Sequence, residues 1–466
     1  MTGIPDLVAV KAMDAADPLR AMRDRFVLPQ GVIYLDGNSL GAASRAAFDE
    51  LRKAATEEWS HDLIRAWNTA RWFNMPLELG DQLGRLIGAA VGQTVVCDTT
   101  SVNIYKLLHA AMAMRPERQA IVAEGDSFPT DLYMAEGVVS TRKDALLRLS
   151  GVDAPTIEEL IDDRTAVVLV NHVNYKSGEL RDMPALTRRA QEAGAMIVWD
   201  LCHTAGAMPV ELDKANADFA VGCTYKYLNG GPGAPAFIYA AERHLSDIQQ
   251  PLTGWWGHAR PFAFEPGYAA GTGIRRFLCG TQPILSMRTL KGALDIWDDV
   301  DMTAVRKKSI ALADLFIELV EAKCGTYGLT LESTRDGEKR GSQISFMHEH
   351  GYQIMRALIE RGVIGDFRAP STMRFGFTPL YVGYADVWQA VEVLEDILRT
   401  GAWKDARFAI KAAVTEIDAR AGIVRLAMMR RAMLAARLQG HIAREGAGCS
   451  NVILPIGTTP MPTAPT

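Results

Sequence analysis

The sequence predicts an α/β protein with a large, mostly parallel β-sheet and a smaller α+β domain after it. Three observations lead to this prediction. From about residue 118, short apolar runs alternate with helix-length amphipathic segments, as in strands joined by crossover helices. After about residue 283 the alternation ends, and long helical patterns accompany only a few short strands. The 466 residues are also too many for one hydrophobic core.

The first expected elements precede the sheet. Residues 32–35 form a short β-like run that leads into a turn rich in Gly, Asn and Ser, which ends at residue 41. Apolar residues at helical spacing then predict three helices, over 42–59, 77–91 and 102–114.

The large sheet is expected from apolar runs of strand length, which lie at 120–123, 166–170, 195–199, 219–222 and 236–239. A helix over 184–193, with Pro184 near its start, separates the second run from the third. The smaller domain is expected to contain a long helical stretch, two strands and two further helices, at 284–322, 343–347, 372–377, 351–361 and 385–399.

These patterns divide the chain into four segments. We expect an N-terminal segment (1–50) that packs on the smaller domain, a large domain (51–283), the smaller domain (284–415) and an extension (416–466). Within the extension, residues 421–443 have a helical pattern rich in Arg and Met, and the Pro- and Thr-rich residues 449–466 are expected to be disordered.

Composition argues against several classes of function. The chain has 50 Lys and Arg against 55 Asp and Glu, and the net charge of −5 disfavours nucleic acid or an anionic membrane as the main partner. The apolar runs are far shorter than the ~20 residues that span a membrane. The six cysteines include no CxxC pair, so neither a disulfide framework nor a structural zinc site is expected. We therefore expect a cytoplasmic protein without a metal site.

Polar side chains follow three of the predicted strands. Asn171 comes directly after the second strand, Asp200 directly after the third, and Lys226 shortly after the fourth. Each of these residues alone is more often a solvated loop residue. Because ligands of open parallel sheets bind outside the carboxyl ends of the strands, the three together indicate a binding site at one edge of the sheet.

An Asp beside a Lys at such an edge suits pyridoxal phosphate. The amine of Lys226 can form a Schiff base with the aldehyde, and the carboxylate of Asp200 can keep the pyridine nitrogen protonated. The phosphate needs donors, and residues 99–101 offer hydroxyls and free backbone amides before the helix at 102–114. Without the Asp and Lys, residues 99–101 would be read as an ordinary helix cap.

Seven motifs, in order along the chain from about residue 30 to about residue 400, resemble those of kynureninases. They lie at residues 34–41 (YLDGNSLG), 128–131 (FPTD), 199–203 (WDLCH), 225–233 (YKYLNGGPG), 254–258 (GWWGH), 280–283 (GTQP) and 374–381 (RFGFTPLY). One motif alone would indicate only the wider class-V aminotransferase and desulfurase group. All seven in order point to kynureninase within that group.

The resemblance implies the fold of fold-type-I pyridoxal phosphate enzymes, with a small C-terminal domain and an active site shared across a homodimer interface. It makes Lys226 the Schiff-base lysine and Asp200 the partner of the pyridine nitrogen. It implies that Phe128 stacks on the cofactor ring, with the rest of its motif, Pro129, Thr130 and Asp131, nearby, and that Asn171 is a small polar cofactor contact. The residues at the phosphate end would be Thr100, Ser101, His203 and Tyr225. Trp255 and Thr281 would come from the partner subunit. Arg374 would bind the α-carboxylate of the substrate, with Ser39 and Trp67 also on the substrate side.

The function that the resemblance implies is hydrolysis of L-kynurenine, or also of 3-hydroxy-L-kynurenine, to anthranilate and L-alanine in tryptophan catabolism. Lys226 would take the Cα proton, and Tyr225 would relay a proton to the departing alanine. Two alternatives stay open. The first is another class-V reaction, such as cysteine desulfuration or transamination. Desulfuration needs a cysteine on a mobile segment, and no Gly/Ser-rich loop surrounds Cys324. The second, a non-catalytic cofactor-binding or scaffold protein, would be expected to have lost Lys226 or Asp200.

Overall fold

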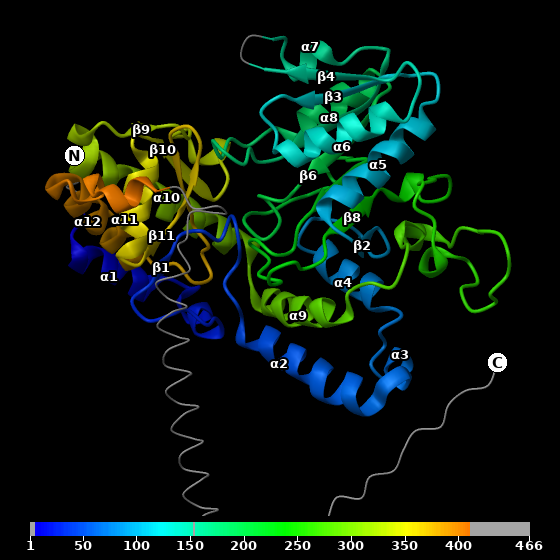
Figure 1. The fold of residues 1–466 in the computed structure, drawn as a ribbon, viewed down its shortest axis with the longest axis horizontal. Helices are drawn as coiled ribbons and strands as arrows, with labels where there is room; N and C mark the ends of the chain where they lie inside the picture. Colours follow the sequence, from blue (N-terminus) through cyan, green and yellow to red (C-terminus); the bar gives the residue numbers. More distant parts are fainter. Residues whose placement is uncertain (1–4, 152–153, 411–466) are drawn as a thin grey trace, which may run out of the picture. The chain divides into compact units, whose positions relative to one another are not determined.

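A computed structural model of the chain describes residues 5–151 and 154–410, which belong to one compact unit (Figure 1). The expected extension (416–466), with its helical pattern and its tail, lies outside the described residues. The boundaries expected at residues 50, 283 and 415 stay a prediction.

The large sheet has seven strands in the order β2-β8-β7-β6-β5-β3-β4. They are β2 (Thr94–Val96), β3 (Ala120–Glu124), β4 (Leu146–Ser150), β5 (Thr165–Asn171), β6 (Met196–Asp200), β7 (Phe219–Gly222) and β8 (Phe237–Ala240). Only β8 runs against its neighbours, so the sheet is mostly parallel as predicted. All five predicted strands are present within one residue of their expected bounds.

Two strands were missed for different reasons. Strand β2 is only three residues long, too short for a periodic pattern. Strand β4 lies at the edge of the sheet and is partly exposed, so it lacks the continuous apolar run of the buried strands.

Helices cover both faces of this sheet. In β5, Val167 and Leu169 pack with Leu107 of α5 (Thr100–Met114), and α6 (Pro129–Ser140) contributes to the same core. Val168 of β5 belongs to the core of the opposite face, with residues of α4 (Met75–Gly84), α8 (Met183–Glu192) and α9 (Ile284–Leu294). Both faces are therefore buried, which explains the continuous apolar runs of the central strands.

Three expected helices have different bounds in the structure. The helix expected over 42–59 is α-helical only in α2 (Arg45–Lys53) and continues as a π-helix (Ala54–Asp62). The helix expected over 77–91 ends early, as α4. The stretch expected over 284–322 is interrupted by a 3₁₀ turn (Asp295–Asp299), because Asp301 accepts hydrogen bonds from two backbone amides and starts a new helix, α10 (Met302–Cys324).

The smaller domain contains an antiparallel sheet in the order β12-β13-β10-β9. Its strands are β9 (Thr330–Leu331), β10 (Gln343–Met347), β12 (Asp366–Arg368) and β13 (Thr372–Gly376). Helices α10, α11 (Gly351–Glu360) and α12 (Tyr384–Thr400) accompany it. The two strands and the two shorter helices expected in this domain are confirmed within about one residue, whereas the long helical stretch is divided as described above.

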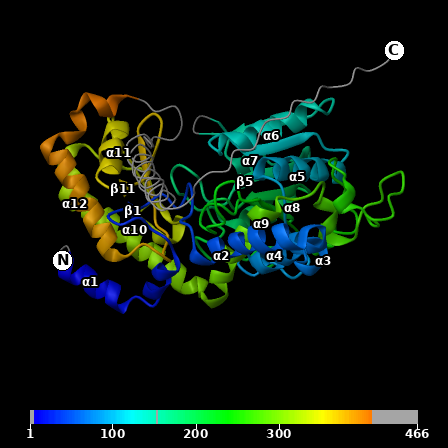
Figure 2. The same ribbon diagram turned by 60° about the horizontal axis from the view of Figure 1, so that its bottom comes forward.

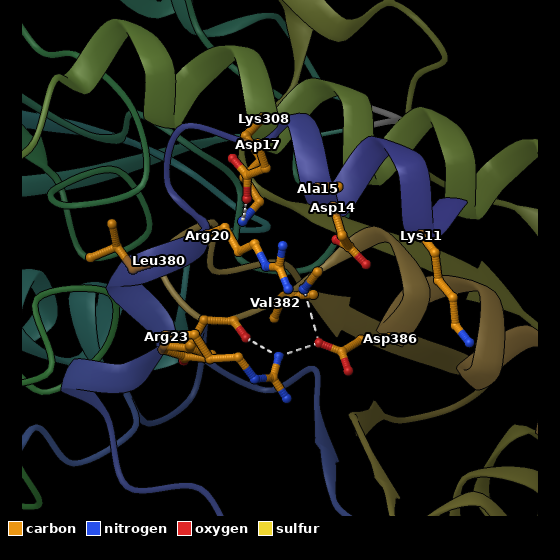
Figure 3. Close-up of a pocket in the computed structure, with 12 residues that line it drawn as sticks. Lys11, Asp14, Ala15, Asp17, Arg20, Arg23, Lys308, Leu380, Val382 and Asp386 are labelled. Carbon is orange, nitrogen blue, oxygen red and sulfur yellow. Dashed lines mark hydrogen bonds and ion pairs between the residues drawn. The ribbon is translucent and has the colours of Figure 1, made fainter. Parts of the chain in front are cut away.

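The N-terminal segment contacts the smaller domain. Helix α1 (Leu7–Ala16) lies against α12 (Figure 2), and β1 (Ile33–Tyr34) pairs in parallel with β11 (Val363–Ile364). Residues of the N-terminal segment and of the smaller domain line a pocket of about 450 Å³. In Figure 3, Asp17 lies beside Lys308, 2.7 Å apart, and Asp386 pairs with Arg23. The N-terminal segment is thus held by one buried ion pair, Asp17–Lys308, and by the more exposed pair of Arg23 and Asp386, as well as by apolar packing.

None of the described helices is long and apolar enough to cross a membrane. Within residues 5–151 and 154–410, no cluster of three or more His, Cys, Asp or Glu side chains could hold a metal ion.

Candidate active site

A pocket of about 150 Å³ lies at the carboxyl ends of β5 and β6, where the sequence predicted a binding site. The residues that line it come from five separate segments and are Thr100, Ser101, Phe128, Thr130, Asp131, Asn171, Val173, Tyr175, Asp200, Cys202, His203, Tyr225 and Lys226. The fold thus brings together ten of the residues that the resemblance assigned to the cofactor. Pro129 occupies the first turn of α6 and does not line the pocket.

Two buried carboxyl groups share one amide in this pocket. Asn171 and Asp200 are register partners at the ends of β5 and β6. The Asn171 Nδ2 atom donates to Asp131 Oδ2 (2.8 Å) and to Asp200 Oδ2 (3.3 Å), and the Cys202 amide donates to the other oxygen of Asp200 (2.6 Å). Burial and the neighbouring Asp200 raise the pKa of Asp131 well above its ordinary value. The raised pKa favours the protonated form of Asp131, while Asp200 accepts a hydrogen bond on each of its oxygens.

The amine of Lys226 is held by His203. The Lys226 Nζ and His203 Nε2 atoms are 2.9 Å apart, and His203 Nδ1 lies 3.1 Å from Gln343 Oε1. Because Gln343 Nε2 donates to the Tyr175 carbonyl, its Oε1 faces His203 and accepts the Nδ1 proton. Burial and the positive charge of Lys226 hold the pKa of His203 well below its ordinary value. His203 is thus a neutral acceptor for the Lys226 amine.

The loop that carries Lys226 packs against the 34–41 motif. The Gly41 amide donates to the Tyr225 carbonyl (2.8 Å), and a Cβ atom on Gly41 would lie 2.2 Å from the Lys226 carbonyl oxygen. Only glycine permits this approach, which gives the final glycine of the motif a physical reason.

The N-terminus of α5 presents its first turn to the pocket. The Thr99 hydroxyl accepts a hydrogen bond from the Val102 amide as the N-cap, so Thr100 and Ser101 occupy the first turn, where backbone amides are free. The fully buried Lys106 steadies the preceding loop, since its Nζ atom lies 2.5 Å from Asp98 Oδ2 and 2.6 Å from a backbone carbonyl. The free amides at the N-terminus of α5 would favour an anionic group beside Thr100 and Ser101.

Phe128 precedes α6 at the mouth of the pocket. Its ring meets that of Tyr175 edge-on, with centroids 5.4 Å apart, and lies 5.9 Å from Lys226 Nζ. One face of a flat ligand joined to Lys226 could therefore stack on this ring.

Arg374, in β13, stands behind Tyr175 rather than in the lining of the pocket. Its side chain is 1% exposed. The guanidinium donates from Nε to Asp366 Oδ1 (2.7 Å), from a terminal nitrogen to Ser39 Oγ (3.2 Å), and to the Tyr175 carbonyl. Asp366 thus holds one edge of the guanidinium.

Trp67, Trp255 and Thr281 do not line this pocket. Trp67 packs in a cluster of aromatic rings, 5.2 Å from Trp256 and 5.9 Å from Trp255. Thr281 is exposed. Trp255 and Thr281 were expected to serve the site of a partner subunit.

Sequence reasoning missed several residues that shape the site. Tyr175, Gln343 and Asp366 lie in no quoted motif and reach the site only through the fold. Cys202 could have been found, because it lies between Asp200 and His203 in a motif already quoted.

Comparisons with known proteins agree with this geometry. A family model described as "Kynureninase C-terminal domain" matches residues 305–394. The chain is 52% identical over 410 residues to a kynureninase of Burkholderia pseudomallei, covering 87% of this chain and 98% of that protein. It is 51% identical over 410 residues, with the same coverage, to a kynureninase of Pseudomonas fluorescens.

Two solved structures share the fold. The cysteine desulfurase of Thermococcus onnurineus NA1 superposes with a TM-score of 0.69 at 18% identity, covering 82% of this chain and 98% of that chain. A C-DES variant with glycine covalently linked to its PLP cofactor gives 0.71 at 13% identity, covering 80% and 99%. At such identities they show the fold alone, and they confirm the fold-type-I prediction.

Proposed function

This chain belongs to the kynureninase family and hydrolyses L-kynurenine to anthranilate and L-alanine with pyridoxal phosphate as cofactor, and we propose that Lys226, Asp200 and Arg374 carry this reaction. The observation that supports this assignment is the pocket in which Lys226 faces the buried pair of Asp131 and Asp200.

The residues of the pocket fit the cofactor. The first turn of α5, with Thr100 and Ser101, offers donors for its phosphate, and Asp200 offers a carboxylate for its pyridine nitrogen. Phe128 offers a ring face, and Lys226 the amine that joins its aldehyde. When bound, pyridoxal phosphate supplies an electron sink for the charge that develops on the substrate.

Lys226 is the proposed general base that takes the Cα proton of the substrate. With the cofactor and substrate bound, a free Lys226 amine would take the proton from Cα, as a general base does. His203, neutral and fixed by Gln343, accepts a hydrogen bond from this amine and keeps it oriented. Burial and the neighbouring Asp200 favour the protonated form of Asp131.

Tyr225 is the proposed proton donor to the departing alanine at Cβ. The neighbouring Cys223 and burial raise the pKa of its hydroxyl, so the hydroxyl keeps its proton before donating it to Cβ. The Tyr225 ring lies beside the Lys226 amine, 5.9 Å from centroid to Nζ.

The other class-V reactions are not favoured. Cys324 ends α10 as a fully buried residue, and burial raises the pKa of its thiol to about 12. It lacks the exposure and the thiolate that a sulfur-carrying cysteine needs. A non-catalytic role does not account for the intact Lys226 and Asp200.

Borohydride reduction tests the assignment of the lysine. Reducing the purified yellow holoenzyme should fix the cofactor permanently on Lys226 and abolish anthranilate formation. Peptide mass spectrometry locates the adduct, and an adduct on any other lysine would overturn the site. Assays with kynurenine and with 3-hydroxykynurenine establish the preference between the two.

Arg374→Lys should lower kcat/KM for kynurenine by roughly 10- to 150-fold, the equivalent of about 1.5–3 kcal/mol for a charge-assisted bidentate contact. Lysine keeps the charge but loses the planar fork that matches a carboxylate. Bound cofactor, read from its absorbance, should persist because other residues hold it. The exposed Arg361→Lys is the matched control. Wild-type kcat/KM in Arg374→Lys would mean that another residue holds the carboxylate.

We further propose a cytoplasmic homodimer in which each subunit supplies Trp255 and Thr281 to the other's site. The aromatic cluster around Trp255 continues into exposed apolar side chains, among them Phe262 and Phe264, the latter 86% exposed. Such a surface suits a subunit interface. All five described cysteines are free, which is consistent with a reducing compartment.

Mixing two inactive variants tests the shared site. Lys226→Ala and Trp255→Ala, denatured and refolded together, should recover about a quarter of wild-type activity, because a hybrid dimer keeps one complete site. Each variant refolded alone serves as the control. Recovery no greater than the sum of the two alone would argue that each subunit works by itself.

A further inference from the structure

Four charged side chains lie together behind the pocket, on three segments of the fold. Asp366 and Arg374 are register partners on β12 and β13, and Arg368 ends β12. Asp36, in the turn after β1, forms a bridge with Gly376 of β13. We call these four residues the Arg374 cluster.

The turn that carries Asp36 is pressed onto β13. A Cβ atom on Gly376 would lie 2.0 Å from Oδ1 and 2.7 Å from Cγ of Asn38, so glycine leaves room for this buried side chain. The backbone bridge between Asp36 and Gly376 sets the position of Asp36 beside the cluster.

Asp366 pairs with both positively charged side chains of the cluster. Its carboxylate contacts both guanidiniums, from Arg374 Nε at 2.7 Å and from Arg368 at 2.7 Å, and it accepts from the Ser39 hydroxyl at 2.9 Å. Arg374 keeps the pKa of Asp366 below its ordinary value even though the carboxyl is buried.

No guanidinium of the described residues pairs with Asp36, whose side chain interacts with the Ser39 hydroxyl. Asp36 is buried, its Oδ1 atom makes no hydrogen bond, and it forms no ion pair within residues 5–151 and 154–410. Burying an unpaired carboxylate costs several kcal/mol, whereas the neutral acid avoids most of this cost.

The groups that face Asp36 have opposing effects. Burial and the negative charge of Asp366 raise its pKa to about 8, while the hydrogen bond with Ser39 and the charges of Arg374 and Arg368 act in the lowering direction. The other titratable groups around it are phenols, at Tyr34, Tyr227 and Tyr381. Their own pKa values are raised, so they stay neutral in the same range.

We propose that Asp36 is a positioning residue that carries a proton while the α-carboxylate of the substrate is bound, leaving Arg374 its net positive charge. This rests on the proposed role of Arg374. With Asp36 neutral, the two guanidiniums outnumber the single carboxylate of Asp366, and the cluster is cationic. With Asp36 ionised the cluster is neutral, and an arriving carboxylate would make it anionic.

This arrangement predicts a specific pH dependence. Below the pKa of Asp36 the affinity for a carboxylate ligand is independent of pH. Above it, binding must take up a proton, and the Kd rises by about tenfold per pH unit. In Asp36→Asn the side chain is neutral at every pH, so this rise disappears.

The test uses the holoenzyme and a ligand without an α-amino group. The compound 4-(2-aminophenyl)-4-oxobutanoate has the carboxylate and aryl ketone of kynurenine but no α-amino group to titrate. Calorimetry across pH 6.5 to 9.5, in two buffers of different ionisation enthalpy, gives both the Kd and the protons taken up. The control ligand, 1-(2-aminophenyl)propan-1-one, lacks the carboxylate and should bind independently of Asp36.

Above pH 8, ligand binding to the wild type should take up nearly one proton more than binding to Asp36→Asn. The Kd of Asp36→Asn above pH 8 should equal its Kd at neutral pH. Titration of the cofactor is common to both proteins and cancels in the comparison. If Asp36→Asn does not fold, Arg368→Gln replaces it, and loss of that cation should move the rise in Kd to higher pH.

Equal proton uptake in wild type and Asp36→Asn, or an unmoved midpoint in Arg368→Gln, would overturn the inference. Anthranilate formation by the wild type is measured separately. A chain that makes anthranilate without this proton uptake refutes only the role of Asp36, whereas a chain that makes none refutes the proposed function.

Discussion

Turnover of kynurenine is expected to fall by roughly 10²- to 10⁴-fold or more when Lys226 is replaced by alanine, because the general base at Cα is lost. The amine lies in the pocket, 2.9 Å from His203, and no other lysine lines that pocket. Steady-state anthranilate formation gives kcat, and absorbance gives the cofactor content.

Lys214→Ala is the matched control, since Lys214 is exposed and lies outside the pocket. Its kcat should equal that of the wild type. Added methylamine should restore part of the turnover of Lys226→Ala, because a small amine can enter the space left by the side chain. Undiminished kcat in Lys226→Ala would remove Lys226 from the mechanism.

Asp17→Asn is expected to lower the free energy of unfolding by about 3–5 kcal/mol near neutral pH, because it leaves a buried ammonium without its counter-charge. The side chains of Asp17 and Lys308 are only 3% and 6% exposed, and their atoms are 2.7 Å apart (Figure 3). Urea unfolding of the holoenzyme measures the change.

The sign of its pH dependence follows from Lys308. Burial already lowers the pKa of this amine, and the loss of Asp17 lowers it further. Between the folded and unfolded pKa values the unfolded chain binds more protons, so stability rises with pH there. The deficit of Asp17→Asn should therefore shrink as the pH is raised toward about 10. A deficit independent of pH would mean that Lys308 is not the cause.

Asp299→Asn provides the comparison for an exposed pair. Asp299 lies 2.9 Å from Arg25, with both side chains largely in solvent. Its loss should cost less than about 1 kcal/mol. A cost equal to that of Asp17→Asn would contradict the distinction between buried and exposed pairs.

The central strands and the first site residues could be predicted from the sequence because the physics that places them is local. Strands β5 and β6 are buried on both faces, so each reads as an unbroken apolar run that ends in a polar residue. Parallel pairing then brings Asn171 and Asp200 together in register. Strand β4 was missed because its partial exposure removes the continuous apolar run. The interruption before Asp301 was missed because an N-cap divides a stretch whose apolar spacing is helical throughout.

The sequence by itself determined the mostly parallel sheet, the polar residues at its carboxyl edge and, through its motifs, the family. Only the tertiary structure decided how these groups act. It places Gln343 of the smaller domain against His203, so that His203 accepts from Lys226. It also sets Asp366 between two guanidiniums and leaves Asp36 without an ion pair among the described residues. Protonation depends on burial and on charges a few ångströms away, and segments more than a hundred residues apart supply both.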